Sequence, residues 1–205
     1  MNDAVSVFSD WARAGRAEPM GEAHAPRAVQ ALERLAVGPG DRVLDLGCGE
    51  GWASRWLAER VVPGGEAIGL DGSAAMLERA RATPRPGLRY VQGDLLALPF
   101  DDRSVDHAFS MEALYYIPVD AGLAELARVL RPGGRVAVCT DFYREHEASH
   151  AWPGQLGLEM DLRSQAEWEQ ALVDAGFVAV TSVRLADPAK PDHPGTLAVF
   201  GRRAG

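Results

Sequence analysis

Residues 42–51 read Arg42-Val43-Leu44-Asp45-Leu46-Gly47-Cys48-Gly49-Glu50-Gly51, and this stretch decides the fold. Its apolar first half is typical of a parallel strand that is covered on both faces. Three glycines at alternate positions follow, and a helical pattern resumes at Trp52. Glycine permits positive φ and a close approach of ligand to backbone, and the free amides of a helix N-terminus face that ligand. The stretch therefore predicts a strand, a turn and a helix that together bind a nucleotide cofactor.

The spacing of the glycines narrows the class of cofactor. A dinucleotide-binding loop has the pattern G-x-G-x-x-G, whereas this chain has Gly47-x-Gly49-x-Gly51, with Asp45 two residues ahead. A carboxylate at that point is an unfavourable neighbour for a pyrophosphate and a favourable one for an ammonium or sulfonium group. The stretch resembles the first motif of the class I S-adenosylmethionine-dependent methyltransferases, which is an acid, one residue and then alternate glycines.

Strand and helix signals alternate along the rest of the chain, which indicates a parallel sheet with right-handed crossovers. The expected strands are 42–46, 67–70, 88–92, 105–110, 135–140, 177–185 and 196–201. The expected helices are 52–61, 74–81, one from Pro118 or Asp120 to the turn Arg131-Pro132-Gly133-Gly134, and 164–175. With the resemblance, this order implies an α/β, Rossmann-like methyltransferase fold. It has a mostly parallel seven-stranded sheet, helices on both faces and an antiparallel C-terminal edge hairpin.

Length and composition indicate one globular domain over 1–205. The resemblance implies that this domain is divided into an N-terminal helical lid (1–37) and a Rossmann-like core (38–205). The net charge of −8 argues against a nucleic-acid surface, which needs clustered cations. No 18-residue apolar run and no basic-then-apolar N-terminus occur, so we expect neither a membrane helix nor a signal peptide. The two cysteines, Cys48 and Cys139, offer neither a disulfide framework nor a zinc site, and a cytoplasmic location fits best.

The resemblance extends over roughly residues 38 to 202 and implies the contacts of the cofactor, S-adenosylmethionine. From the first motif these are Asp45, Gly47, Cys48 and Gly49. The second landmark, Gly69-Leu70-Asp71-Gly72-Ser73-Ala74-Ala75-Met76-Leu77, adds Asp71, Gly72 and Met76. An acid at the end of this strand can accept hydrogen bonds from both ribose hydroxyls. The alternative is an aspartate that caps a helix or forms a turn.

The third landmark, Gln92-Gly93-Asp94-Leu95-Leu96-Ala97-Leu98-Pro99-Phe100, implies Gly93, Asp94 and Leu95 as adenine contacts. Asp94 would take the adenine amino group, and the Leu95 backbone N–H would meet a ring nitrogen. The alternative is that Asp94 only forms an Asx-turn.

The fourth landmark is the strand 105–110 and the segment Met111-Glu112-Ala113-Leu114-Tyr115-Tyr116-Ile117. Open α/β sheets bind ligands at the carboxyl ends of their strands. Ser110 and Met111 are therefore candidate cofactor contacts. Glu112, Tyr115 and Tyr116 are candidate substrate contacts, and the alternative is a helix start whose aromatic side chains are buried.

Two further segments could reach the acceptor. In the relatives, helices that precede the core cover the active site, so Met20 and His24 could face cofactor or substrate; a plain packing helix is the alternative. The apolar insertion 142–162, with Trp152, Pro153, Leu156, Leu158 and Met160, could line the acceptor pocket.

No catalytic residue is assigned from the sequence. The sulfonium supplies the reactivity, so a dedicated base is optional. The residues whose region of the chain would allow this role are His24, Glu112, Asp141 and His146. His107 lies within an expected strand, which indicates a structural histidine. His146 and His150 have helical metal-site spacing without a third ligand, so we expect a solvated polar face and no metal.

The resemblance implies transfer of a methyl group to an oxygen, nitrogen or carbon atom of a small molecule, as in quinone-biosynthesis and small-metabolite enzymes. Two alternatives stay open: a non-catalytic S-adenosylmethionine-binding protein that acts through a partner, and an NAD-dependent oxidoreductase, which the glycine spacing disfavours. The expected partner is a small-molecule substrate, with no nucleic acid and no membrane; the oligomeric state is not indicated.

Overall fold

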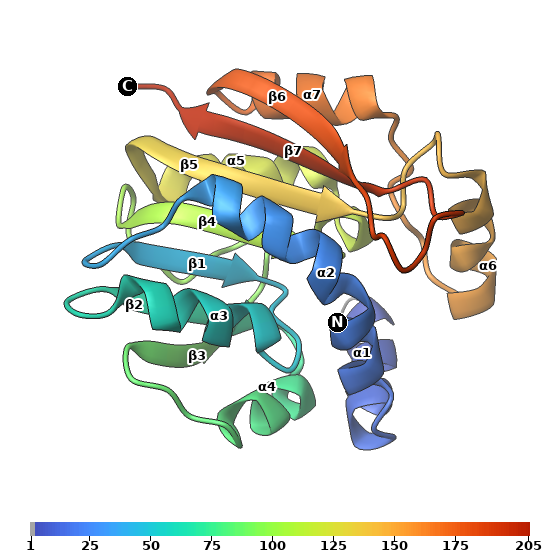
Figure 1. Cartoon of the computed structure of the whole chain (residues 1–205), viewed down its shortest axis with the longest axis horizontal. Coiled ribbons are helices and arrows are strands. Elements are labelled where there is room, and N and C mark those ends of the chain that lie inside the picture. The colour runs from blue at the N-terminus through green and yellow to red at the C-terminus, as the bar shows by residue number, and fades with distance from the viewer. Residues whose placement is uncertain (1–2) are drawn as a thin grey trace.

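The computed structural model describes residues 3–205, apart from the side chains of Asp3, Ala17, Glu18, Met20 and Glu22. Its centre is a seven-stranded sheet in the order β3-β2-β1-β4-β5-β7-β6 (Figure 1). The strands are β1 (Arg42–Leu46), β2 (Glu66–Asp71), β3 (Leu88–Gln92), β4 (Val105–Met111), β5 (Leu130–Thr140), β6 (Phe177–Leu185) and β7 (Thr196–Arg203). The first five are parallel, and β7 lies antiparallel between β5 and β6. The predicted fold class is thereby confirmed, including the antiparallel C-terminal hairpin.

Helices cover both faces of this sheet. They are α1 (Asp3–Arg13), α2 (Ala17–Leu35), α3 (Trp52–Val61), α4 (Ala74–Arg81), α5 (Val119–Val129), α6 (Trp152–Leu156) and α7 (Gln165–Asp174), with short 3-10 turns η1 (Leu114–Tyr116) and η2 (Glu147–Ala151). Figure 1 shows α2 and α3 in front of the sheet and α5 behind it. Among the described residues, no helix combines the length and the apolar character that crossing a bilayer requires.

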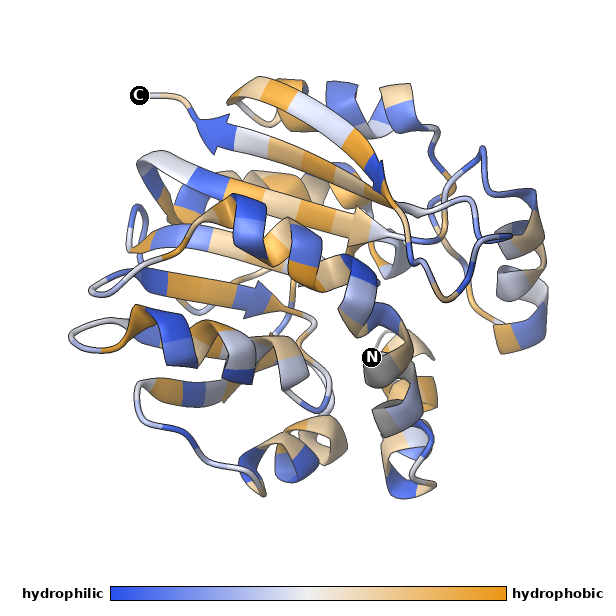
Figure 2. Ribbon diagram, in the orientation of Figure 1, coloured by the Kyte–Doolittle hydropathy of each residue, from blue (hydrophilic) through white to orange (hydrophobic). Residues whose placement is uncertain are grey.

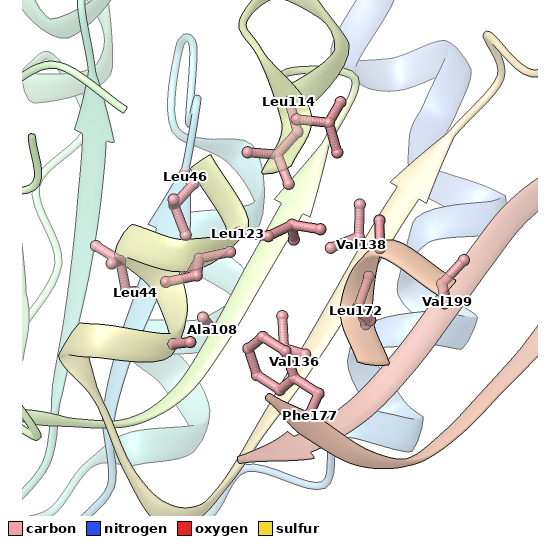
Figure 3. Packing of buried hydrophobic residues seen from close by; sticks show 14 of the residues in the cluster. Leu44, Leu46, Ala108, Leu114, Leu123, Val136, Val138, Leu172, Phe177 and Val199 are labelled. Carbon is pink, nitrogen blue, oxygen red and sulfur yellow. The ribbon is translucent and has the colours of Figure 1, made fainter. Parts of the chain in front are cut away.

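The alternation of side chains along the strands creates two cores. Leu44 belongs to the core that includes residues of α5 and α7, while Val43 next to it belongs to the core that includes residues of α2 and α3. Figure 3 shows the first core, in which Leu123 of α5 and Leu172 of α7 meet the sheet. Figure 2 shows the same division as strands rich in hydrophobic residues beneath helices with hydrophilic outer faces. Burial on both faces explains why the central strands read as nearly continuous apolar runs.

The start of β5 differs from the prediction. The sequence placed a turn at 131–134 and a strand from Arg135, whereas pairing already begins at Leu130, opposite Val105. The next regular pair is His107 with Arg135, so the intervening residues bulge out of the ladder, with Gly133 at φ 81°. Sequence rules treat Pro-Gly-Gly as the end of an element, but a bulge lets the strand continue through it.

The predicted bounds of α4 are confirmed, those of α7 differ by one residue at each end, and α5 ends at Val129, before the predicted turn. The Ser73 hydroxyl accepts a hydrogen bond from the Met76 backbone N–H at 3.2 Å and so caps α4. Ser164 and Glu167 form a reciprocal capping box at the start of α7. Gly176 follows α7 with φ 89°, as expected for a left-handed helix end.

Candidate functional site

One large cavity, about 1120 Å³, opens at the carboxyl ends of β1, β2 and β4. Most of the predicted cofactor contacts line it: Asp45, Gly47, Cys48, Gly49, Asp71, Gly72, Met76, Gly93, Asp94, Leu95 and Met111. The predicted substrate contacts His24, Glu112, Tyr115 and Tyr116 line the same cavity. The fold therefore brings together residues from the four sequence landmarks, and their binding roles stay predictions.

The glycine loop has three positive φ angles, 67° at Gly47, 53° at Gly49 and 78° at Gly51. A Cβ atom added to Gly47 would lie 2.3 Å from the Cβ of Ala113, and one added to Gly51 would lie 2.2 Å from the Tyr90 hydroxyl. A Cβ atom added to Gly49 would meet no described atom within 4 Å. Two of the glycines thus permit tight packing inside the protein, while the middle one faces open space.

Asp71, at the end of β2, holds the glycine loop in place by a hydrogen bond. Its Oδ2 accepts a hydrogen bond from the Gly49 backbone N–H at 2.9 Å, and its Oδ1 accepts one from the Ser73 backbone N–H at 2.8 Å. Burial raises the pKa of the Asp71 carboxyl, and these two bonds oppose the rise. The turn interpretation and the ligand interpretation are compatible, because a carboxylate oxygen can accept more than one hydrogen bond.

Asp45 is more deeply enclosed than the sequence suggests. Its Oδ2 accepts a hydrogen bond from the Ser54 hydroxyl at 2.5 Å, and the side chain is almost fully buried. Burial raises the pKa of Asp45 to about 7, opposed by the bond from Ser54. Near neutral pH the carboxyl is therefore only partly ionised, which weakens the charge that the sequence argument assigned to it.

Asp94 and Ser110 complete the set of predicted cofactor contacts. Asp94 is exposed, and its Oδ1 accepts a hydrogen bond from the Leu96 backbone N–H at 2.9 Å, so the Asx-turn is present. Ser110 is buried, donates to the Leu46 carbonyl at 3.3 Å and does not line the cavity. Its neighbour Met111 does, because side chains alternate along β4.

Glu112 lies where β4 ends, with a φ of 55° that is rare for a residue other than glycine. Its Oε2 accepts a 2.7 Å hydrogen bond from the Tyr115 hydroxyl, and its Oε1 accepts one from the Asp141 backbone N–H. Burial raises the pKa of Glu112 to about 8, and the negative charge of Asp141 adds to the rise. Backbone strain at an enclosed carboxyl that lines a cavity is typical of functional sites.

Aromatic side chains surround this end of the cavity. Tyr115 is buried and Tyr116 half-buried, and Phe8 of α1 packs edge-on against Tyr116 with ring centroids 5.1 Å apart. Phe8 also packs against Trp11 at 5.4 Å. From the insertion, Trp152, Gln155 and Leu156 line the cavity, whereas Leu158 and Met160 contribute to burial elsewhere. The N-terminal segment and the insertion 142–162 thus both contribute to the wall.

A buried polar cluster, which we call the Arg27–Asp141 cluster, lies beside Glu112. Its members are Arg27, Asp141 and Thr196. Arg27 donates to Asp141 Oδ2 at 2.7 Å and to the Thr196 hydroxyl at 2.6 Å, and that hydroxyl donates to Asp141 Oδ1 at 2.5 Å. Arg27 also lies 3.8 Å from a carboxylate oxygen of Asp187. The sequence analysis missed Arg27 and Thr196, which are 169 positions apart and belong to no motif.

Two histidines approach the cluster. His24 Nε2 and His193 Nε2 each lie 3.6 Å from Asp141 Oδ2. His24 lines the cavity, and His193 is not among its lining residues. Of the four regional candidates for a base, His24 and Glu112 therefore line the cavity, and Asp141 contacts both of them.

One of the histidine predictions is confirmed and another is wrong. His107 is structural as predicted, since its Nδ1 accepts from the Arg135 backbone N–H at 3.3 Å and its Nε2 lies 3.4 Å from Asp41. The solvated face predicted for His146 is wrong: this side chain is buried, 2.7 Å from the Asp141 carbonyl and against the ring of His193. It lies on an irregular turn before η2, so helical spacing with His150 does not apply.

Three further predictions concern Met20, a metal site and the two cysteines. Met20 falls among the side chains that the structure does not describe. Over the described part of the chain, no group of three or more His, Cys, Asp or Glu side chains could hold a metal ion. Cys48 and Cys139 are both free and buried.

Comparison with known proteins places this geometry among methyltransferases. A family model described as a methyltransferase domain matches residues 43–134. The chain is 38% identical to the malonyl-[acyl-carrier protein] O-methyltransferase of Erwinia pyrifoliae, over 88% of this chain and 70% of that protein. It spans less of other curated relatives, such as 49% of a methyltransferase from Streptomyces halstedii.

Solved structures give the same assignment. The methyltransferase in a complex with the Trm112 activator of Haloferax volcanii is 37% identical, with a TM-score of 0.86, and the match covers 97% of this chain and 98% of that one. An S-adenosylmethionine-dependent methyltransferase from Mesorhizobium loti is 27% identical, with a TM-score of 0.70, covering 87% of this chain and 98% of that one.

Proposed function

The chain belongs to the S-adenosylmethionine-dependent methyltransferases, and from this premise we propose that it transfers the methyl group of S-adenosylmethionine to a small-molecule acceptor. The observation that carries the proposal is the single cavity that joins the glycine loop to the enclosed polar and aromatic end around Glu112. A cofactor at the loop and an acceptor at the other end would share one space, which is the geometry that methyl transfer needs.

The residues at the loop fit this cofactor. The open space beside Gly49 admits a ligand against the backbone, and the Asp71 carboxylate lines the same space with acceptor capacity for ribose hydroxyls. Asp94 and Leu95 lie farther along the wall, where the adenine would be held. The sulfonium of the bound cofactor supplies an activated methyl group, so the protein has mainly to orient the acceptor and exclude water.

The character of the other end supports a small, partly apolar acceptor. Phe8, Trp11, Tyr116 and Trp152 line the cavity, with Phe8 packed against both Tyr116 and the cluster that contains Met76, and aromatic side chains favour flat or apolar ligands. A 2-phytyl-1,4-naphtoquinone methyltransferase of Trichormus variabilis is 34% identical over 67% of this chain, although the match covers only 59% of that protein. Its name contains 2-phytyl-1,4-naphtoquinone, a molecule with a flat ring system and an apolar chain that an aromatic wall would suit.

The direct test is product formation. Purified protein, S-adenosylmethionine and a panel of hydroxyl, amine and quinol acceptors should give S-adenosylhomocysteine at a rate that depends on the acceptor. Binding of S-adenosylhomocysteine without turnover on any acceptor would favour the non-catalytic alternative. Thermal stabilisation by NAD but not by S-adenosylhomocysteine would favour the oxidoreductase alternative, because a bound ligand raises apparent stability.

A second candidate is that the chain works together with a small activator protein. The Haloferax volcanii relative, which matches nearly the whole chain, was solved as a complex with the Trm112 activator. If this chain has the same requirement, adding that activator should form a complex on size-exclusion chromatography and raise the rate of methyl transfer. An unchanged elution volume and rate would leave the chain acting alone.

A further inference from the structure

Asp141 occupies a fixed position at the end of β5. Its side chain is 3% exposed, and Arg27 and the Thr196 hydroxyl each hold one of its carboxylate oxygens. A guanidinium and a hydroxyl that each bond to one oxygen fix the direction of the carboxylate. It can therefore orient a further hydrogen-bond donor that lies beside it.

His24 is the donor that reaches the cavity. Its side chain is 21% exposed, it lines the cavity, and its Nε2 is the atom 3.6 Å from Asp141 Oδ2. At 3.6 Å this contact is electrostatic and longer than a hydrogen bond, and the carboxylate favours the tautomer that carries its proton on Nε2, which leaves Nδ1 with a free lone pair. Such a pair resembles the histidine and carboxylate of other proton-transfer sites, where the carboxylate sets the tautomer and stabilises the imidazolium.

The groups that face His24 keep its imidazole neutral near pH 7. Burial lowers the pKa of His24, the charge of Asp141 opposes the fall, and Arg27, Lys190 and His193 add to it. A neutral imidazole is the form that accepts a proton. Glu112 is less suited, because burial and the charge of Asp141 raise its pKa and so favour the protonated form, which cannot accept the proton.

We propose that His24, oriented by Asp141, accepts the proton of an uncharged hydroxyl acceptor during methyl transfer; the inference rests on the proposed function. In this step the acceptor oxygen forms a bond to the methyl carbon while the carbon–sulfur bond breaks, and the sulfur keeps that electron pair. The hydroxyl proton passes to Nδ1 of His24, so the products are the methyl ether, S-adenosylhomocysteine and an imidazolium beside Asp141. The proton then leaves to solvent.

The charges around the cavity favour a hydroxyl over a carboxylate acceptor. The described lining residues include two arginines, Arg55 and Arg79, and both bond to Glu50 at the glycine-loop end. At the other end the lining residues offer Glu112 and His24 instead of a cation. A carboxylate acceptor would find no positive charge at this end, because the lowered pKa of His24 keeps its imidazole neutral, and an unpaired charge is costly in an enclosed site.

The chain provides a matched control. His193 has the same distance to Asp141 Oδ2 as His24, and burial likewise lowers its pKa, but it does not line the cavity. We would measure S-adenosylhomocysteine formation with 2-naphthol, 1-naphthylmethylamine and 2-naphthoate, which present a hydroxyl, an amine and a carboxylate on one ring frame. The enzyme variants are His24→Gln and His193→Gln.

We expect turnover of 2-naphthol and little of 2-naphthoate. His24→Gln should lower kcat by about 100-fold or more, the usual contribution of general base catalysis, and should remove the rise of kcat through the pKa of His24. His193→Gln should keep the rate at the high-pH plateau and should shift the midpoint of the pH profile only slightly upward, because His193 is the smallest of the influences on the pKa of His24. Affinity for S-adenosylhomocysteine, measured by calorimetry, should be unchanged in His24→Gln, which would show that this variant is folded and binds the cofactor.

Three outcomes separate the inference from the proposed function. Turnover of the hydroxyl by His24→Gln at the rate and pH profile of the parent would overturn the role of His24 and leave methyl transfer intact. A preference for the amine or the carboxylate would overturn the acceptor class. If no acceptor reacts, the proposed function fails, and ring NMR still tests the pair: Asp141→Asn should lower the pKa of His24 further, and an unmoved pKa would remove Asp141 as its orienting group.

Discussion

The glycine-loop end of the cavity is made mostly of backbone, and the end around Glu112 is made mostly of side chains. At the loop end, Gly47, Gly49 and Asp71 follow directly from β1 and β2, so two short stretches of chain shape it. At the other end, α1, α2, η1, β5 and α6 each contribute side chains or support them. The first end depends on local conformation, and the second depends on how distant elements pack together.

Arg27→Met gives the largest expected effect and tests the packed end. Removing the guanidinium leaves Asp141 buried with a hydroxyl as its main remaining partner, which should lower the free energy of unfolding by about 3–5 kcal/mol. Urea denaturation would measure this loss. The double variant Arg27→Met/Asp141→Asn should recover part of the stability, and a single variant as stable as the parent would contradict a cluster held by charge.

Glu112→Gln should change how stability depends on pH. The folded-state pKa of Glu112, about 8, lies above its ordinary value of 4.5, so stability is fully present below about pH 4.5 and is lost as pH rises through 8. Between pH 5 and 9, the free energy of unfolding of the parent should fall by roughly 2–4 kcal/mol more than that of the variant. Denaturation midpoints measured across that range would show the difference. If the midpoints of both proteins changed with pH in the same way, folding would not raise the pKa of Glu112.

Asp71→Ala tests the backbone end through binding. Loss of the carboxylate should weaken the affinity for S-adenosylhomocysteine by about 1.5–3 kcal/mol, the range for a charge-assisted hydrogen bond. Isothermal titration calorimetry would measure it. Because Asp71 also holds the Gly49 and Ser73 amides, the comparison should include Ser73→Ala, which removes the α4 cap and the hydroxyl contact with Ser9 but keeps the Asp71 carboxylate. Equal affinity in the parent and in Asp71→Ala would exclude Asp71 from the cofactor site.

Gly49→Ala gives the smallest expected change in stability. Its φ of 53° would cost an alanine about 1–2 kcal/mol, with no clash among the described residues. Gly47→Ala carries similar backbone strain and also places a Cβ on Ala113, so it should lose more. Thermal unfolding of the two variants would compare them. Affinity for S-adenosylhomocysteine should fall in Gly49→Ala, and equal losses of stability in both variants would show that the loop is uniformly packed.

The difference between the two ends also explains what could be predicted from the sequence. The strands, the caps at Ser73 and Gly176 and the landmarks around Asp71 and Asp94 are local patterns, and periodicity and spacing are sufficient to predict them. The Arg27–Asp141 cluster joins α2, β5 and β7, and no local rule relates these residues to one another. The prediction of a solvated face at His146 was wrong for the same reason, because this side chain is buried against His193 and Trp152, which are distant in sequence.

The contact between Gly47 and Ala113 constrains how enzymes of new specificity could arise from this one. The 2.3 Å approach of an added Cβ means that the chain just after Glu112 crosses the glycine loop almost backbone to backbone. A library that enlarges position 113 to reshape the acceptor pocket would displace the cofactor loop at the same time. Diversity introduced at Phe8 and Trp11, on a separate helix over the same pocket, leaves that crossing untouched. Because the Ser9 hydroxyl of α1 bonds to Ser73 beside the cofactor loop, such diversity should be confined to Phe8 and Trp11.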